Sequence, residues 1–197
     1  MSAKKGKLAI PVEQLSEDTI RLTDVLNGET DLACVVVGAA FLDAALKTLL
    51  SEKLLKSSDT TAKLLDDGGP LGTFSARADL AYCLSLVSKH HHKDLRLVME
   101  IRNQFAHKHL KLAFDDLKVR EMCGRLNEWK ILLRGQEDNT TSDLTPKQLT
   151  TKARNQFNYS VIFISNWLLL TALRLKGGAP VVRPTEIPDS PTHHPVV

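Results

Sequence analysis

Six consecutive residues, Arg102-Asn103-Gln104-Phe105-Ala106-His107, bring together side chains that could carry out phosphodiester cleavage. A histidine can move a proton near neutral pH, and an arginine can hold a phosphate and stabilise the charge that develops on it. Residues five apart on an α-helix point about 140° away from each other, whereas Asn103 and His107, four apart, share a face. A site built on Arg102 and His107 would therefore need the helix to end near His107, or a second subunit to complete it.

A structural role for the same residues is the stronger alternative on sequence mechanics alone. The apolar seam of the predicted helix holds Arg102 together with Leu95, Val98 and Phe105. Arg102 could therefore point inward and pair with a carboxylate such as Asp43 or Asp79, and His107 could satisfy a carbonyl at the helix end. We assign no catalytic residue on this basis.

Other clusters of reactive residue types give weaker signals. His90, His91 and His92 lie in a charged stretch, residues 89–93, that we expect to form a corner between helices. Adjacent histidines rarely converge as ligands, so we predict no metal site. The segment Gly68-Gly69-Pro70-Leu71-Gly72 lacks the Gly-Lys-Ser/Thr ending of a phosphate loop and predicts a tight connection. We also predict no cofactor.

The three cysteines bear on the compartment. Cys34, Cys83 and Cys123 each lie in an apolar stretch with helical patterning and form no Cys-x-x-Cys pair. We expect all three to be buried and reduced, as in the cytoplasm. No apolar region follows the first seven residues, which argues against a secretory signal. The most apolar run, Val161–Leu175, is too short and too interrupted for a membrane span, so we predict no transmembrane segment.

Length and composition favour one globular domain. The chain has 197 residues, of which 43% are hydrophobic and 25% charged, with a net charge of +3. That charge is too small to indicate nucleic-acid binding, although it is compatible with DNA contact. Basic residues gather moderately between Lys89 and Arg120, but acidic residues offset half of them, as on a solvated helix face. No helix-turn-helix pattern is recognisable.

Hydrophobic periodicity predicts an all-α, single-domain bundle of about six helices and no strands. The expected helices cover residues 13–26, 31–56, 75–88, 93–108, 116–133 and 146–176, with a short helical turn at 63–66. Thr145-Pro146-Lys147-Gln148 is typical of a capped helix start. Residues 1–12 are predicted to be a flexible basic arm, 13–176 the helical domain, and 177–197 a disordered Pro-rich tail.

Two further features concern the last helix. The tetrapeptide Arg102-Asn103-Gln104-Phe105 recurs as Arg154-Asn155-Gln156-Phe157, but the flanking residues differ and we interpret the repeat as chance. The apolar run Val161–Leu175 can be buried in the core or can form a homodimer interface.

Several motifs together resemble the mannitol-operon repressor family of bacterial regulators. They are Ala39-Ala40-Phe41-Leu42-Asp43, the stretch Gly69-Pro70-Leu71-Gly72-Thr73-Phe74-Ser75-Ala76-Arg77-Ala78-Asp79-Leu80-Ala81-Tyr82, and Asp94-Leu95 with Ile101-Arg102-Asn103-Gln104-Phe105-Ala106-His107 and Phe114-Asp115-Asp116. The resemblance covers residues 30–130. It singles out as family-motif residues Asp43, Gly69, Pro70, Leu71, Phe74, Ser75, Asp79, Arg102, Asn103, Phe105 and His107.

This resemblance implies a cytoplasmic, all-helical regulator that represses genes of mannitol uptake and utilisation. It also implies that no ordinary DNA-binding motif need be present, so repression can act through a protein partner rather than through direct operator contact. No membrane partner is implied.

The spacing of Arg102, Asn103 and His107 is also similar to the motif of HEPN-domain ribonucleases, which are helical bundles too. That similarity implies a metal-independent endoribonuclease in which Arg102 and His107 are the catalytic pair and Asn103 supports them. The sequence departs from the motif at His109, where some such enzymes have tyrosine.

Overall fold

The computed structural model describes residues 11–28, 30–54, 59–107, 112–132, 145–178 and 180. These residues contain eight helices and no strand, which confirms the all-α fold class. The helices are α1 (Val12–Gly28), α2 (Asp31–Lys53), α3 (Asp59–Leu65), α4 (Phe74–Cys83), α5 (Lys89–His107), α6 (Leu117–Arg125), α7 (Glu128–Leu132) and α8 (Pro146–Lys176).

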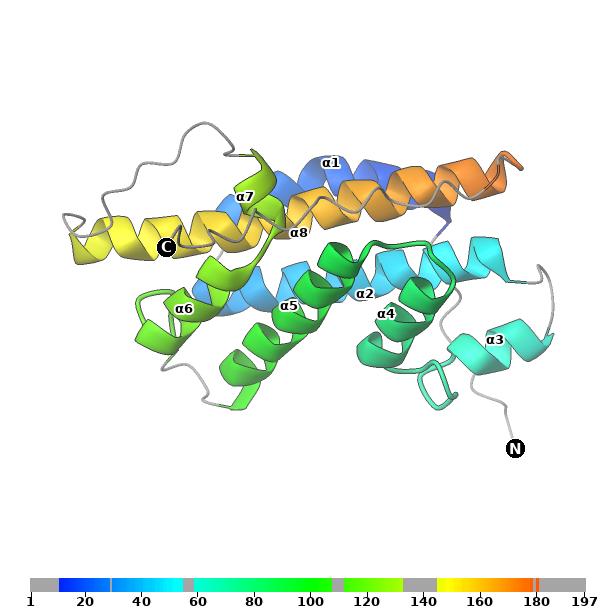
Figure 1. The fold of residues 1–197 in the computed structure, drawn as a ribbon, viewed down its shortest axis with the longest axis horizontal. Helices are drawn as coiled ribbons and strands as arrows, with labels where there is room; N and C mark the ends of the chain where they lie inside the picture. Colours follow the sequence, from blue (N-terminus) through cyan, green and yellow to red (C-terminus); the bar gives the residue numbers. More distant parts are fainter. Residues whose placement is uncertain are drawn as a thin grey trace, which may run out of the picture.

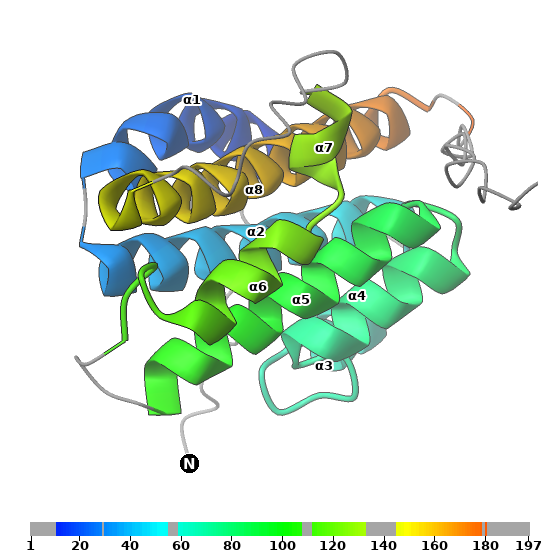
Figure 2. The ribbon, with the colours of Figure 1, turned by 60° about the vertical axis from the view of Figure 1, so that its left-hand side comes forward.

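The long helix α2 runs through the middle of the bundle. It contacts α1 and α8 on one side and α4 and α5 on the other (Figure 1). The shorter helices α6 and α7 complete the domain, with α6 beside α5 and α7 against α8 (Figure 2). The result is two layers of helices that share α2 as their common core element.

Polar side chains fix where the helices begin. Thr30, Thr73, Asp116 and Thr145 each accept a hydrogen bond from a backbone N–H in the first turn of α2, α4, α6 and α8. At α8 the predicted capping box forms, because the side chain of Gln148 also accepts from the backbone N–H of Thr145 at 2.9 Å.

Three phenylalanines join the two layers at the centre of the core. The ring of Phe114 lies 5.8 Å from that of Phe105 on α5 and 5.7 Å from that of Phe157 on α8, measured between centroids. Gly38 of α2 gives the Phe157 ring room, since a Cβ there would lie 3.2 Å from its Cε1 atom. Aromatic packing therefore ties α2, α5 and α8 into one unit.

α2 is long and apolar enough to cross a membrane by length and composition. Half of its most apolar 18-residue window is buried inside the domain, however, and α2 contacts five other helices, α1, α3, α4, α5 and α8. This is the position of a core helix, and the run predicted as most apolar, Val161–Leu175, lies in α8.

Three expected boundaries were wrong. Helix α4 ends at Cys83 rather than near Ser88, because Ser85 adopts a positive φ of 57° that turns the chain. Residues 89–93 are not a corner but the first turn of α5. The helix expected over 116–133 is broken at Leu126 and Asn127, so it forms the separate helices α6 and α7.

The short helix predicted at 63–66 is longer than expected, since α3 begins at Asp59. Val12, placed in the N-terminal arm, is the first residue of α1 and is buried. Residues 1–10 of that arm and nearly all of the tail lie outside the described residues, so the expected flexibility of the arm and disorder of the tail stay predictions.

Candidate functional site

The glycine-containing motif that follows α3 builds a tight turn. The backbone N–H of Leu71 donates to the Leu64 carbonyl at 2.9 Å, and that of Gly72 donates to Gly69 at 2.9 Å. A Cβ at Gly69 would lie 2.1 Å from the Lys63 carbonyl oxygen, so only glycine fits there. Pro70 is exposed beside them. The turn delivers Phe74, which is buried, to the start of α4.

Asp43 has a structural partner that the sequence interpretation missed. Its carboxylate binds Arg77, not Arg102, with Nη1 of the arginine 2.6 Å from Oδ1. Arg77 is only 2% exposed and also donates to the Leu65 carbonyl at 3.1 Å. This pair connects α2 to α4 and to the end of α3.

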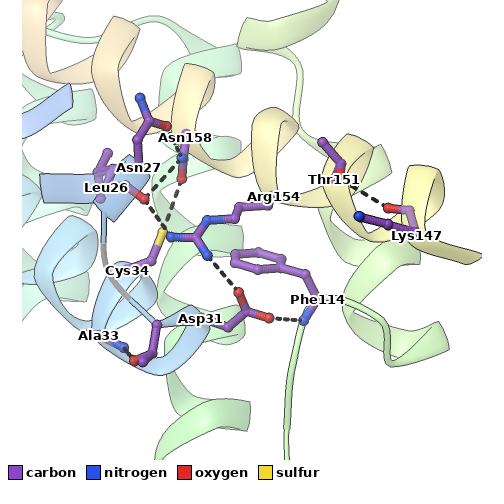
Figure 3. Close-up of polar contacts among 11 residues, drawn as sticks. Leu26, Asn27, Asp31, Ala33, Cys34, Phe114, Lys147, Thr151, Arg154 and Asn158 are labelled. Carbon is purple, nitrogen blue, oxygen red and sulfur yellow. Dashed lines mark hydrogen bonds and ion pairs between the residues drawn. The ribbon is translucent and has the colours of Figure 1, made fainter. Parts of the chain in front are cut away.

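A second polar cluster connects the α1–α2 junction to α8 (Figure 3). Arg154 binds Asp31 at 2.9 Å and donates to the Leu26 carbonyl at 2.8 Å. Asp31 also accepts from the backbone N–H of Phe114 at 2.9 Å. The Cys34 thiol beside them donates to Oδ1 of Asn158 at 3.1 Å. These contacts hold α8 against the α1–α2 junction, next to the aromatic core at Phe114.

Two of the family-motif residues, Ser75 and Asn103, line one hollow of about 780 Å³. Helices α5, α6 and α7 form most of it, and α4 contributes Ser75. Its lining consists of Ser75, His92, Lys93, Asp94, Arg96, Leu97, Met99, Glu100, Asn103, Arg125, Asn127 and Lys130. We refer to these residues as the α5–α7 hollow.

Asp79 supports one wall of the α5–α7 hollow. One carboxylate oxygen lies 2.7 Å from Nε2 of His92, and the other accepts from Arg96 at 3.3 Å. The imidazole of His92 also stacks on Tyr82 with 4.8 Å between ring centroids. The expected Arg102–Asp79 pair was therefore wrong, because His92 and Arg96 occupy this carboxylate.

Asp94 of α5 lines the hollow and belongs to a buried polar cluster at the start of α7. Asp94 is fully buried and accepts from the backbone N–H groups of Asn127 and Glu128 at 2.7 and 2.9 Å, and from the Asn127 side chain at 2.6 Å. Burial raises the pKa of Asp94, while these hydrogen bonds oppose the rise. Glu128 lies 3.2 Å from Nε2 of His91. Asp94 thereby caps α7 from α5.

The rim of the hollow is cationic. The lining holds four lysines and arginines against two carboxylates, and the Asp94 carboxylate is buried. Lys93 and Arg125 have no ion-pair partner in the described part of the chain, and Lys130 lies 5.9 Å from the centroid of the Trp129 ring. Arg125, Asn127 and Lys130 were not among the predicted residues. The signal for Asn127 was its type, since asparagine before Glu128 is typical of a helix start.

Arg102 and His107 are both exposed near the end of α5, and the structure gives no contact between them. Nη1 of Arg102 donates to Oδ1 of Asn103 at 3.2 Å. The expectation of an inward Arg102 was wrong, since the seam position that faces the core belongs to Phe105 instead. Asn103 lines the α5–α7 hollow, so it alone joins this group to the hollow.

The histidines of residues 90–92 and the three cysteines differ among themselves in burial and in their contacts. His91 is buried against Glu128 and Trp167, whereas His92 faces Asp79, so consecutive histidines serve different contacts. Cys34 and Cys123 are buried as predicted, and burial raises the pKa of each thiol to about 12. Cys83 is exposed, contrary to prediction, because α4 ends there at the surface.

Comparison with known proteins adds to this geometry. The sequence profile described as "Mannitol repressor" matches residues 24–173. No significant match emerged from the comparison with curated protein sequences. Among solved structures, a chain of the MtlR–HPr complex from Escherichia coli is similar with a TM-score of 0.61 and 21% identity, over 76% of this chain and 97% of that one. That similarity supports the fold, and the profile match covers well over half of the sequence: the chain belongs to the mannitol repressor family.

Proposed function

We propose that this chain is a mannitol repressor-type regulator that acts by binding a protein partner, and that the α5–α7 hollow is its docking surface. Family membership over residues 24–173 supports the regulatory role. The observation that carries the docking surface is the set of exposed cations Lys93, Arg125 and Lys130, which form no ion pair with a described residue, around a hollow of about 780 Å³.

The partner class follows from the similar solved structure, which holds HPr in complex with the E. coli protein. We infer that an HPr-type protein binds this chain too, in the cytoplasm, and that this contact controls repression of mannitol uptake and utilisation genes. Charged rim residues steer encounter and set specificity, so a cationic rim favours a partner with an acidic patch. Repression then needs no helix-turn-helix in this chain.

The test measures HPr binding by isothermal titration calorimetry, using HPr from the same genome. Arg125→Glu is expected to weaken binding at least about tenfold, because reversal of a rim charge introduces repulsion. Arg174→Glu is the matched control, since Arg174 is exposed on α8 away from the hollow and its loss leaves binding unchanged. Equal loss in both variants, or no binding by the wild type, would contradict the proposal.

Direct DNA contact and a homodimer stay predictions, and two measurements address them. Gel shift with the chain's own mannitol promoter is expected to show no tight, sequence-specific complex in the absence of a partner. Light scattering after size exclusion reports the oligomeric state, for which the apolar surface of α8 is the candidate interface.

The second candidate is a metal-independent endoribonuclease that uses Arg102, Asn103 and His107. The favouring observation is that Arg102 and His107 are solvent-exposed and that Arg102 donates to Asn103. Cleavage of a mixed RNA by the wild type in the presence of EDTA, lost in a folded His107→Ala variant, would establish this activity. Absence of cleavage by both would remove it.

A further inference from the structure

A second hollow lies between α7 and the first half of α8, separate from the α5–α7 hollow. Its volume is about 530 Å³, and Trp129 and Tyr159 contribute two aromatic rings to its wall. Three carboxamides, of Gln148, Asn155 and Gln156, line it as well, together with Lys147 and Lys152. We refer to it as the α7–α8 hollow. This volume is within the range of small-molecule sites.

Gln156 and Trp129 are the polar residues of the α7–α8 hollow whose surroundings favour a bound ligand. The side chain of Gln156 is only 7% exposed, yet it has no hydrogen-bond partner among the described residues and lines the hollow. The indole Nε1 of Trp129 is also buried without a partner. Buried polar groups are nearly always paired, and an unpaired one costs about 1–3 kcal/mol, so the buried indole N–H of Trp129 calls for an explanation. The largely buried Gln156 lines the same hollow.

The types of residue in the hollow indicate what the ligand is. Aromatic rings pack against the C–H faces of a carbohydrate-like chain, and a carboxamide both donates to and accepts from its hydroxyl groups. The lining contains two lysines and no carboxylate, which favours an anionic substituent such as a phosphate. The first turn of α8, where Lys147 lies, also has no acidic residue.

We propose that the α7–α8 hollow binds a phosphorylated sugar alcohol. The polyol chain lies against Trp129 and Tyr159, Gln156 binds its hydroxyl groups, and Lys147 and Lys152 hold the phosphate. The site goes beyond the proposed protein docking and stands on its own residues; only the choice of mannitol as the polyol to be tested rests on family membership. Because α7 contributes to both hollows through Trp129 and Lys130, the ligand would sit next to the docking surface.

The experiment titrates the full chain by calorimetry with three probes: mannitol 1-phosphate, mannitol and inorganic phosphate. Mannitol 1-phosphate is expected to bind, mannitol at least about tenfold more weakly, and phosphate alone not measurably. Gln156→Leu and Lys152→Gln should each weaken the binding of mannitol 1-phosphate at least about tenfold. Gln104→Leu is the matched control, since Gln104 occupies the same place in the other Arg-Asn-Gln-Phe tetrapeptide and its variant should bind normally.

Three results would overturn the site. They are no binding of mannitol 1-phosphate at millimolar concentration, mannitol binding as tightly as its phosphate, and unchanged binding by folded Gln156→Leu protein. Circular dichroism establishes that each variant is folded. HPr binding by the same preparations separates this outcome from that of the proposed function, because Gln156→Leu should retain HPr binding in the absence of the polyol.

Discussion

The two Arg-Asn-Gln-Phe tetrapeptides, residues 102–105 on α5 and 154–157 on α8, have the same letters and different surroundings. Their phenylalanines have the same packing role, since Phe105 and Phe157 both contact Phe114, from opposite layers of the bundle. The two copies of the repeat, which we interpreted as chance, therefore both contact the ring of Phe114, although their flanking sequences differ.

The polar residues of the two tetrapeptides diverge. Arg154 binds Asp31 and the Leu26 carbonyl (Figure 3). Arg102 is exposed and donates to its neighbour Asn103. Gln104 pairs at the surface with Lys118 at 3.3 Å, whereas Gln156 is only 7% exposed and makes no hydrogen bond to a described residue. The same residue type therefore has a different role in each copy, because different elements pack beside it.

The largest expected effect is on stability, and it tests the packing role that Phe105 and Phe157 share. Phe105→Ala and Phe157→Ala should each lower the free energy of unfolding by about 3–5 kcal/mol, because each removes a buried ring and leaves a cavity. Urea denaturation followed by circular dichroism measures this loss. A loss below 1 kcal/mol at either position would mean that the two rings are not equivalent core residues.

The arginines should differ in stability. Arg154→Ala should cost about 1–3 kcal/mol, because it removes the ion pair with the partly buried Asp31 and the hydrogen bond to the Leu26 carbonyl. Arg102→Ala should change stability by less than about 0.5 kcal/mol, as is usual at an exposed position. The same urea titrations decide it, and equal losses would break the contrast between the two copies.

The glutamines should show a smaller and opposite effect. Gln156→Leu is expected to leave stability unchanged or to raise it by up to about 1 kcal/mol, since a largely buried side chain that makes no hydrogen bond to a described residue gives way to an apolar one of similar size. Thermal unfolding monitors the change, with Gln104→Leu as the surface control. A loss of more than about 1 kcal/mol on Gln156→Leu would assign that residue a structural bond instead.

The cysteines allow a further comparison of buried and exposed positions, because Cys34 and Cys123 are buried and Cys83 is exposed. Ellman's reagent should react with Cys83 alone in the native protein and with all three thiols after unfolding. Burial raises the pKa of Cys34 from 9.0 to about 12, so the native state keeps a proton that the unfolded state loses. The free energy of unfolding should therefore fall as the pH rises from 9 toward 12. Rapid reaction of Cys34 in native protein would contradict its burial.

Local patterns predicted most of the fold because helix signals are local. Thr30 and Thr145 begin helices where their capping chemistry indicated, and the apolar spacing placed α2 and α8. Boundaries failed where no residue type signals the end of a helix, or where a contact distant in the sequence decides it. The end of α4 depends on the backbone of Ser85, and the break between α6 and α7 is held by Asp94, over 30 residues away.

The candidate site was harder to predict for the same reason. Ser75 and Asn103 were singled out, but nothing in the sequence places them in one hollow with Arg125 and Lys130. The partner of Asp43 was wrongly expected to be Arg102, because several arginines fit the helical spacing and only packing selects Arg77. Asp79 and Arg102 could be named from type and spacing, whereas their actual partners could not.

The central claim is that the α5–α7 hollow is the surface that binds a protein partner. The most direct test is nuclear magnetic resonance of the isotopically labelled chain during titration with unlabelled HPr. We predict shift changes centred on Arg96, Arg125 and Lys130, with Arg174 on α8 unaffected. Shift changes confined to the outer face of α8, or none at saturating HPr, would contradict the account.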